Sequence, residues 1–229
     1  MKKLVIIPVY NEEKNIGIVL SELKQVCPDI DILIIDDGSS DSSYKVCRDS
    51  EICEVIKLPT NLGIGGARQT GFKYAQKYDY DVVIQMDGDG QHDPSNIEAF
   101  VSEIKNGVDL CIGSRFITYE GFQSSFMRRI GISIIYNLIK IVSGQKITDP
   151  TSGYRACSKA AIDLFAKEYP QDYPEAESII TAAKKKLVIK EIPVTMNERK
   201  NGKSTIGGYS SVYYMIKVTL ALIIDSMSK

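Results

Sequence analysis

Two acidic motifs give the clearest chemical signal in the sequence. Asp87 and Asp89 stand two residues apart directly after an apolar run, and Gln91 follows at the same spacing. Oxygen ligands in this pattern suit Mg²⁺ or Mn²⁺, which take one or two carboxylates and fill their other positions with substrate phosphates and water. Asp36 and Asp37 end another apolar run. Either motif alone is equally typical of a solvated turn, but two acidic strand ends in one sheet need a cation or ligand to offset their repulsion.

The glycine-rich segment 61–71 has only part of the pattern of a phosphate-binding loop. Arg68 stands where G-x-G-x-x-G requires its third glycine, and no G-x-x-x-x-G-K-S/T occurs in the chain. These departures disfavour a dinucleotide-binding oxidoreductase. A tight loop with close helix packing is an equally good interpretation of the glycines.

The only histidine, His92, follows the second acidic motif. The sequence around it has no recognisable Ser–His–Asp arrangement, so a supporting role in the loop is favoured over that of a catalytic base. Several basic residues, most of them beside Gly or Ser, form a set suited to phosphate oxygens, although each one alone is more often a surface charge. These residues are Arg115, Arg128, Arg129, Arg155, Arg199 and Lys203.

The elements that must position these residues alternate between strand and helix. Short apolar runs without polar alternation are typical of buried parallel strands. Strands are predicted at 4–7, 32–35, 54–58, 82–86, 110–112 and 187–192. Helices are predicted at 15–25, 43–48, 67–78, 94–105, 130–142, 156–167 and 177–186. This order predicts an α/β fold with a doubly wound, mostly parallel sheet flanked by helices, whose strand ends collect the polar motifs.

Composition limits the class of protein. The chain has 229 residues, of which 25% are charged and 44% hydrophobic, as expected for one globular domain. Its net charge of −1 is the sum of a net charge of −8 over residues 1–120 and a net charge of +7 over residues 121–229. The acidic half suggests a metal or nucleotide site, the basic half suggests an anionic surface or substrate, and near-neutrality argues against nucleic acid as a partner. Five scattered cysteines without a C-x-x-C indicate reduced thiols in a cytosolic protein.

The apolar segments suggest contact with a membrane surface. Leu4–Val9 is too short and too quickly followed by charge to be a signal peptide. No stretch reaches the roughly 18 consecutive apolar residues of a spanning helix. Val212–Ile224 is apolar nearly all round, with tyrosines and Lys217 near its start. We therefore expect a catalytic domain over 1–208 and a C-terminal apolar helix over 209–229 that lies on a membrane or packs on a partner, with a core helix as the ordinary alternative.

A series of motifs runs through some 200 of the 229 residues in a recognisable order. They are IPVYNEE at 7–13, DDGSSD at 36–41, NLGIGGARQTG at 61–71, DGDGQHDP at 87–94, GSRF at 113–116, SGYRA at 152–156, YPEAE at 173–177 and IPVTMNERKNGKS at 192–204. Together they resemble glycosyltransferase family two, with its GT-A fold, and within it the polyprenyl-phosphate sugar transferases similar to dolichol-phosphate mannose synthase.

The resemblance implies a role for each matching residue. A nucleotide-sugar would contact Pro8, Tyr10, Glu12, Asp36, Asp37, Gly63, Arg68, Asp87, Arg199 and Lys203, with Ser204 beside them. The divalent metal would be held by Asp87, Asp89 and Gln91, and the acceptor phosphate by Arg115 with Arg128 or Arg129. The residues expected to take part in catalysis are Asp89, Arg115, Arg129 and an acidic residue near the sugar, Glu175 or Glu177.

The implied activity is a metal-dependent, inverting transfer of a sugar to a polyprenyl phosphate such as undecaprenyl phosphate, for cell-surface glycan synthesis. UDP-glucose or UDP-N-acetylglucosamine is the expected donor, rather than a GDP-sugar. A phosphate acceptor is largely ionised near pH 7, so it needs little help from a base. One alternative is a transferase acting on a growing glycan or protein, which would need Glu175 or Glu177 as base. Another is a non-catalytic nucleotide-sugar-binding subunit of a membrane complex.

The expected location is the cytoplasmic face of the plasma membrane, as a peripheral protein. Many lipid-directed members of the family carry transmembrane helices after the catalytic domain, and this sequence stops at Lys229 without them. We therefore expect a small membrane protein, or self-association through the C-terminal helix, to supply the attachment.

Overall fold

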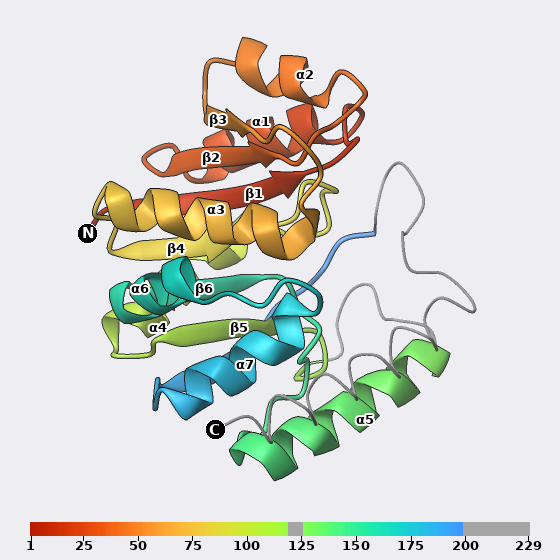
Figure 1. Cartoon of the computed structure of the whole chain (residues 1–229), viewed down its shortest axis with the longest axis vertical. Coiled ribbons are helices and arrows are strands. Elements are labelled where there is room, and N and C mark those ends of the chain that lie inside the picture. Colours follow the sequence, from red (N-terminus) through yellow and green to blue (C-terminus); the bar gives the residue numbers. More distant parts are fainter. Residues whose placement is uncertain (119–125, 199–229) are drawn as a thin grey trace.

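The computed structural model describes residues 1–118 and 126–198 (Figure 1). The strands in these ranges are β1 (Lys3–Val9), β2 (Asp31–Asp36), β3 (Glu54–Lys57), β4 (Val82–Gln85), β5 (Leu110–Ser114), β6 (Arg155–Ser158) and β7 (Ile189–Pro193). The helices are α1 (Ile16–Val26), α2 (Ser43–Asp49), α3 (Gly63–Lys77), the short η1 (Pro94–Asn96), α4 (Ile97–Lys105), α5 (Phe126–Ser143), α6 (Lys159–Lys167) and α7 (Pro174–Lys184).

Within this part of the chain the strands form one seven-stranded sheet in the order β3-β2-β1-β4-β6-β5-β7. β6 is antiparallel to β4 and β5, and the other pairings are parallel. This confirms the predicted mostly parallel sheet flanked by helices. β2 and β4 lie on opposite sides of β1, which is the switch point where doubly wound sheets open a crevice at their carboxyl ends.

Strand β6 corrects one prediction. The expected helix at 156–167 is wrong over 156–158, because these residues belong to β6 and α6 starts at Lys159. Ala156 and Cys157 are fully buried inside the sheet, and this tertiary burial outweighs the helix preference of alanine. Because β6 runs against its neighbours, the loop before it enters at the carboxyl edge of the parallel strands.

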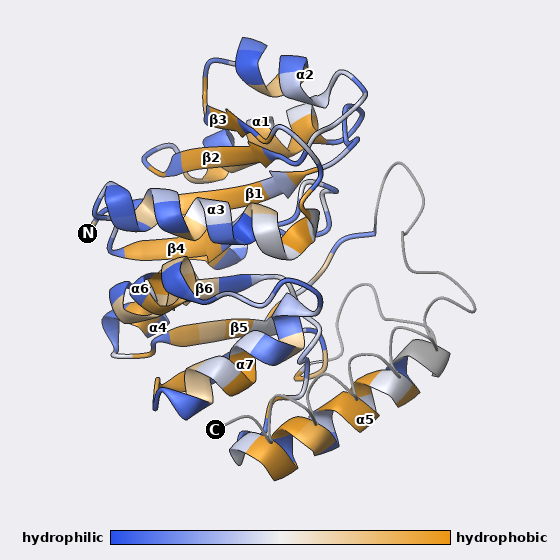
Figure 2. Cartoon of the chain, in the orientation of Figure 1, coloured by the Kyte–Doolittle hydropathy of each residue, from blue (hydrophilic) through white to orange (hydrophobic). Residues whose placement is uncertain are grey.

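Helices cover both faces of the sheet (Figure 1). One core lies under α3, α6 and α7, where the rings of Phe72 and Phe165 pack with centroids 5.2 Å apart. The other lies under α1, α2 and α4 and includes Leu20 and Phe100. β1, β2 and β4 are apolar along most of their length in Figure 2, as burial on both faces requires.

Helix α5 packs against α7 and carries an apolar surface along much of its length (Figure 2). It includes the predicted helix 130–142. α7 begins three residues earlier than predicted, because Pro174 stands at its first position, where a fixed φ favours helix initiation. None of the helices in the described ranges is both long enough and apolar enough to cross a bilayer. The predicted C-terminal helix 209–229 lies outside the described residues, as does the domain boundary at 208.

Candidate functional site

The loops that follow β1 and β2 are hydrogen-bonded to each other. Asn11 N donates to Ser39 Oγ at 3.0 Å, and Ser40 N donates back to Asn11 Oδ1 at 2.9 Å. Glu12 N donates to Ser43 Oγ at 2.8 Å. Asn11 has a φ of +56°, a left-handed conformation that Asn adopts more readily than most residues. The two segments predicted to bind the nucleotide therefore form one preorganised wall, which we call the nucleotide wall.

Asp36 and Asp37 have different surroundings in the nucleotide wall. Burial raises the pKa of the Asp37 carboxyl, although its Oδ1 accepts a hydrogen bond from Leu62 N at 2.7 Å. Asp36 is fully buried, and neither of its carboxylate oxygens has a hydrogen-bond partner among the described residues. Burying a polar group without a partner is unfavourable, so the wall contains an unsatisfied acceptor beside Asp37.

Three further residues predicted to contact the nucleotide lie in or next to the same wall. Pro8 is in β1, opposite Ile35 of β2. Tyr10 follows β1 and is 51% exposed, so its ring is available for stacking. Glu12 Oε2 accepts from Asn15 Nδ2 at 2.6 Å, directly before α1.

Arg68 on α3 joins two carboxylates from distant parts of the chain. Its Nη2 donates to Asp87 Oδ1 at 3.0 Å, and its Nη1 donates to Glu175 Oε1 at 2.5 Å. Arg68 is only 1% exposed, and these charged partners offset the burial of its guanidinium. Burial alone would raise the pKa of the Asp87 carboxyl, but the charge and the hydrogen bond of Arg68 hold it below its ordinary value. The structure thus brings three predicted site residues together at the carboxyl end of β4.

Glu177, the second acidic candidate, is two positions from Glu175 on α7. Residues two apart on a helix do not share a face, so Glu177 lies on a different side of α7 from Glu175. Of the two predicted carboxylates, Glu175 is the one the structure connects to Asp87.

His92 supports the loop that follows β4. Its Nδ1 accepts from Asp87 N at 3.0 Å, which places the ring proton on Nε2, 3.6 Å from Asp87 Oδ2. The ring stacks on Tyr154, with centroids 4.6 Å apart and planes 8° from parallel. Burial lowers the pKa of His92, which keeps the imidazole neutral at neutral pH. These contacts agree with the supporting role predicted for it.

The donor set at the end of β4 suits a divalent cation that also binds substrate. Asp89 Oδ1 accepts from Gln91 N at 3.0 Å, so the two residues share a tight turn, and Asp87 is 34% exposed. In the described residues no three His, Cys, Asp or Glu side chains gather to hold a metal. Mg²⁺ or Mn²⁺ needs only one or two carboxylates from the protein when a diphosphate and water supply its other ligands. Gln91 Nε2 donates to Asn197 O at 3.4 Å, which ties this turn to the chain after β7.

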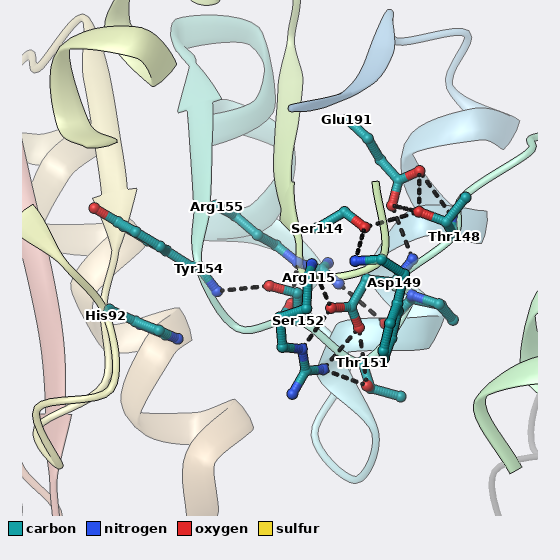
Figure 3. Close-up of polar contacts among 12 residues, drawn as sticks. His92, Ser114, Arg115, Thr148, Asp149, Thr151, Ser152, Tyr154, Arg155 and Glu191 are labelled. Atoms are coloured by element: carbon teal, nitrogen blue, oxygen red, sulfur yellow. Dashed lines mark hydrogen bonds and ion pairs between the residues drawn. The ribbon is translucent and has the colours of Figure 1, made fainter. Parts of the chain in front are cut away.

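Arg115, at the end of β5, forms a buried ion pair with Asp149 (Figure 3). Its Nε donates to Asp149 Oδ2 at 2.7 Å and its Nη2 to Asp149 Oδ1 at 2.8 Å, an arrangement in which both carboxylate oxygens are used. Nη2 also donates to Thr151 Oγ1 at 3.2 Å. The guanidinium is therefore held inside the protein by its own partners, and its predicted contact with an acceptor phosphate stays a prediction.

Arg155 does not face a phosphate site, contrary to the expectation for this set of basic residues. It is fully buried, and its nitrogens donate to Ser152 O at 2.7 Å, Ser178 Oγ at 2.8 Å and Pro150 O at 3.2 Å. Its role is to hold the loop before β6 against α7.

The glycine-rich segment packs closely, as the alternative interpretation of it predicts. Gly63 has a φ of +78° and starts α3, so the helix begins inside the expected loop. A Cβ at Gly65 would lie 2.4 Å from Gln171 O, which leaves no room for a side chain. Whether Gly63 contacts a nucleotide stays a prediction.

A cavity of about 550 Å³ opens between α5 and the ends of two loops, and we call it the α5 cavity. Its lining is mostly apolar and consists of Phe116, Arg129, Ile130, Ile132, Ser133, Tyr136 and Thr148. Arg129 is exposed and brings a cation to it. The side chain of Arg128 and the residues Arg199, Lys203 and Ser204 lie outside what the structure describes.

Asp149 and Glu191 are missing from the residues selected by sequence. Glu191 accepts hydrogen bonds from the backbone of Thr148 and Asp149 (Figure 3). The segment Thr148–Gly153 has only a turn composition, and nothing in it indicates that Asp149 is the partner of Arg115. Asp149 can be recognised as the partner of Arg115 only when the position of β6 is known, because β6 brings this loop next to the end of β5.

Comparisons with known proteins agree with this architecture. Residues 4–165 match the family Glycosyl transferase family 2. A polyprenol monophosphomannose synthase of Mycolicibacterium smegmatis is 30% identical, over 95% of this chain and 85% of that protein. A UDP-N-acetylglucosamine–dolichyl-phosphate N-acetylglucosaminyltransferase of Methanococcus voltae is 31% identical, over 96% of this chain and 97% of that protein. An undecaprenyl-phosphate mannosyltransferase of Micrococcus luteus is 32% identical, over 91% of this chain and 88% of that protein.

Among solved structures, glucosyl-3-phosphoglycerate synthase of Mycobacterium tuberculosis, in complex with Mn²⁺, UDP and phosphoglyceric acid, superposes with a TM-score of 0.74. That similarity covers 98% of this chain and 78% of the other at 16% identity, and it establishes a shared GT-A fold. The sequence matches go further: this chain belongs to glycosyl transferase family 2 and is a glycosyltransferase.

Proposed function

We propose that this glycosyltransferase moves one sugar from a UDP-sugar to a polyprenyl phosphate such as undecaprenyl phosphate, with inversion at the anomeric carbon. The observation that best supports a lipid phosphate as acceptor is the α5 cavity, which combines an apolar lining with the exposed cation of Arg129. A polyprenyl phosphate has the matching parts, an apolar chain and an anionic head. The names of the Mycolicibacterium, Methanococcus and Micrococcus relatives, which all refer to such lipids, support the same class of acceptor.

The donor would lie along the nucleotide wall, with its diphosphate at the turn after β4. Asp87 and Asp89, with Gln91, would hold Mg²⁺ or Mn²⁺ there. When bound, such a cation neutralises charge on the departing nucleoside diphosphate. UDP is favoured over GDP because the Methanococcus relative is named for a UDP-sugar, and that relative also favours N-acetylglucosamine over glucose.

Arg199 and Lys203 would add positive charge over the donor phosphates. The described chain supports this placement, because Asn197 N donates to Gln91 O at 2.9 Å and Gln91 returns a bond to Asn197 O. The segment that carries both cations therefore starts next to the turn of Asp87 and Asp89. Such cations contribute most where negative charge develops in the transition state.

The chemistry needs no strong base from the protein. The second pKa of a phosphate monoester is about 6, so the acceptor is largely a dianion at neutral pH and can attack directly. Glu175 fits this scheme as a partner of Arg68 rather than as a proton acceptor. Arg129, with Arg128 and Arg115, would orient the attacking phosphate.

Helix α5 also suits contact with the membrane that holds the acceptor. On α5 itself, Ile135 and Ile139 are fully buried, whereas Ile134 is 48% exposed and Ile141 is 81% exposed. Exposed large apolar side chains on a helix favour an interfacial position. We propose a peripheral location at the cytoplasmic face, which the five free cysteines support, with attachment completed by a small membrane protein or by pairing of C-terminal helices.

The test is incubation of the protein with undecaprenyl phosphate, Mn²⁺ and a panel of UDP-glucose, UDP-N-acetylglucosamine and GDP-mannose. Mass spectrometry of the lipid should show one added sugar from a UDP donor. Transfer only to a glycan or peptide acceptor would support the second candidate function and contradict the lipid proposal. Donor binding without release of nucleoside diphosphate would identify a non-catalytic subunit instead.

A further inference from the structure

We propose that Glu191 is a positioning residue for the acceptor, fixing the wall of the α5 cavity that Phe116 and Thr148 form. Glu191 does not line the cavity, and neither does Asp149, the residue through which it acts. The inference rests on the proposed function, because it assigns the cavity to the polyprenyl phosphate.

Glu191 uses both carboxylate oxygens on consecutive residues of one loop. Its Oε2 accepts from Thr148 N at 2.7 Å, and its Oε1 accepts from Asp149 N at 2.8 Å. Thr148 Oγ1 lies 3.1 Å from Oε1 and 3.0 Å from Oε2. A carboxylate accepts hydrogen bonds at both oxygens, whereas an amide of the same shape accepts at only one. Glu191 therefore ties the loop before β6 to β7 in a way that depends on its charge state.

The contacts continue from this loop to Ser114 and Arg115 (Figure 3). Asp149 holds Arg115 through Nε, Nη2 and the backbone N, the last at 3.2 Å from Oδ2. Ser114 Oγ is 2.8 Å from Thr148 Oγ1 and accepts from Phe116 N at 3.2 Å. The two wall residues are thus joined by a closed network, so a change at one side shifts the other.

The network is separate from the nucleotide wall. Its residues lie on β5, on β7 and in the loop before β6, whereas the nucleotide wall follows β1 and β2. In the sheet, β4 and β6 separate β1 from β5. The same loop reaches the Arg68 and Asp87 pair only at its far end, at Gly153. Loosening the network should therefore weaken use of the lipid more than it weakens binding of the nucleotide.

The decisive variant is Glu191→Gln. It keeps the size of the side chain, but its NH₂ group cannot accept a hydrogen bond, so one of the two backbone N–H groups loses its acceptor. The control is Glu103→Gln. Glu103 Oε2 accepts a hydrogen bond from Lys190 Nζ at 2.8 Å, and Lys190 directly precedes Glu191 in β7. Steady-state kinetics should give a KM for undecaprenyl phosphate about tenfold higher in Glu191→Gln, as losing a charged hydrogen-bond partner predicts. The dissociation constant for UDP should change much less than the lipid KM, and Glu103→Gln should match the unmodified protein in both measurements.

Equal increases in the lipid KM and the UDP dissociation constant would overturn the inference, as would a lipid KM within twofold of the unmodified protein. Should Glu191→Gln fail to fold, Ser114→Ala tests the same network and should raise the lipid KM about threefold, as loss of one neutral hydrogen bond predicts. An unchanged lipid KM in this variant would contradict the inference.

Two measurements separate this inference from the proposed function. If the unmodified protein makes no lipid-linked sugar, the proposed function fails. The role of Glu191 is then tested separately, by amide hydrogen exchange and by binding of farnesyl phosphate. Glu191→Gln should speed exchange at the amides of Thr148 and Asp149 and weaken farnesyl phosphate binding by a similar tenfold factor. Exchange or binding equal to that of the unmodified protein would overturn the inference.

Discussion

Two buried arginines mark the two sides of the site, and their partners differ in exposure. Arg68 is shared between Glu175 and Asp87, and Asp87 is 34% exposed. Arg115 is paired with Asp149, which is fully buried. A carboxylate that reaches solvent can bind a ligand while its arginine keeps a second partner. The enclosed pair holds its surroundings in place, so we propose that the first pair serves the donor chemistry and that the second sets the shape of the α5 cavity and the position of Arg115.

Removing Asp149 should produce the largest loss of stability. Asp149→Ala leaves the Arg115 guanidinium buried without its carboxylate, which costs about 3–5 kcal/mol. Asp87→Ala should cost less, roughly 2 kcal/mol, because Arg68 keeps Glu175. Urea unfolding of both variants measures the difference. Equal losses would contradict the distinction between the open and the enclosed pair.

A side chain at Gly153 should disturb the open pair by direct contact. A Cβ there would lie 2.7 Å from Arg68 Nη2 and 3.1 Å from Asp87 Oδ2. Gly153→Ala should destabilise the protein by about 1–3 kcal/mol, as overpacking of a buried site does. The control is Gly17→Ala in the exposed part of α1, where the nearest atom would be 3.5 Å away. Gly17→Ala should be neutral or stabilising in the same thermal unfolding series, and a larger loss there than at Gly153 would refute the packing argument.

The smallest effect is expected at Tyr154, which follows the loop before β6. Its hydroxyl donates to Asp93 O at 2.7 Å, while its ring stacks on His92. Tyr154→Phe removes only the hydrogen bond and should lower the free energy of unfolding by about 1 kcal/mol. Tyr78→Phe, at an exposed position, should stay within about 0.5 kcal/mol of the unmodified protein. A loss at Tyr154 no greater than at Tyr78 would show that the hydroxyl does not anchor the loop.

Sequence patterns predicted the positions of the carboxylates at the strand ends better than those of the buried arginines and their partners, for a physical reason. The apolar runs that become β1, β2 and β4 end in the predicted motifs, and parallel pairing brings those ends together without further information. The loop before β6 reaches the site only because β6 is antiparallel, and residues 156–158 have no strand pattern of their own. The partner of Arg115 therefore could not be found before the topology was known.

Arg155 shows the same limit from the opposite direction. Residue type and neighbours suggested a phosphate ligand, but burial directs its guanidinium to backbone carbonyls and to Ser178. Spacing predicts where a carboxylate at a strand end points. It does not predict whether a long basic side chain reaches outward or folds into the protein.

The most direct test of the account is a pair of calorimetric titrations on two variants, one from each side. Asp87→Asn should weaken binding of UDP in the presence of Mn²⁺ by about tenfold or more and leave binding of farnesyl phosphate unchanged, and Arg129→Ala should do the reverse. Lys140→Ala, another exposed cation on α5, should change neither. Loss of both ligands in each variant would contradict the assignment of separate donor and acceptor sides.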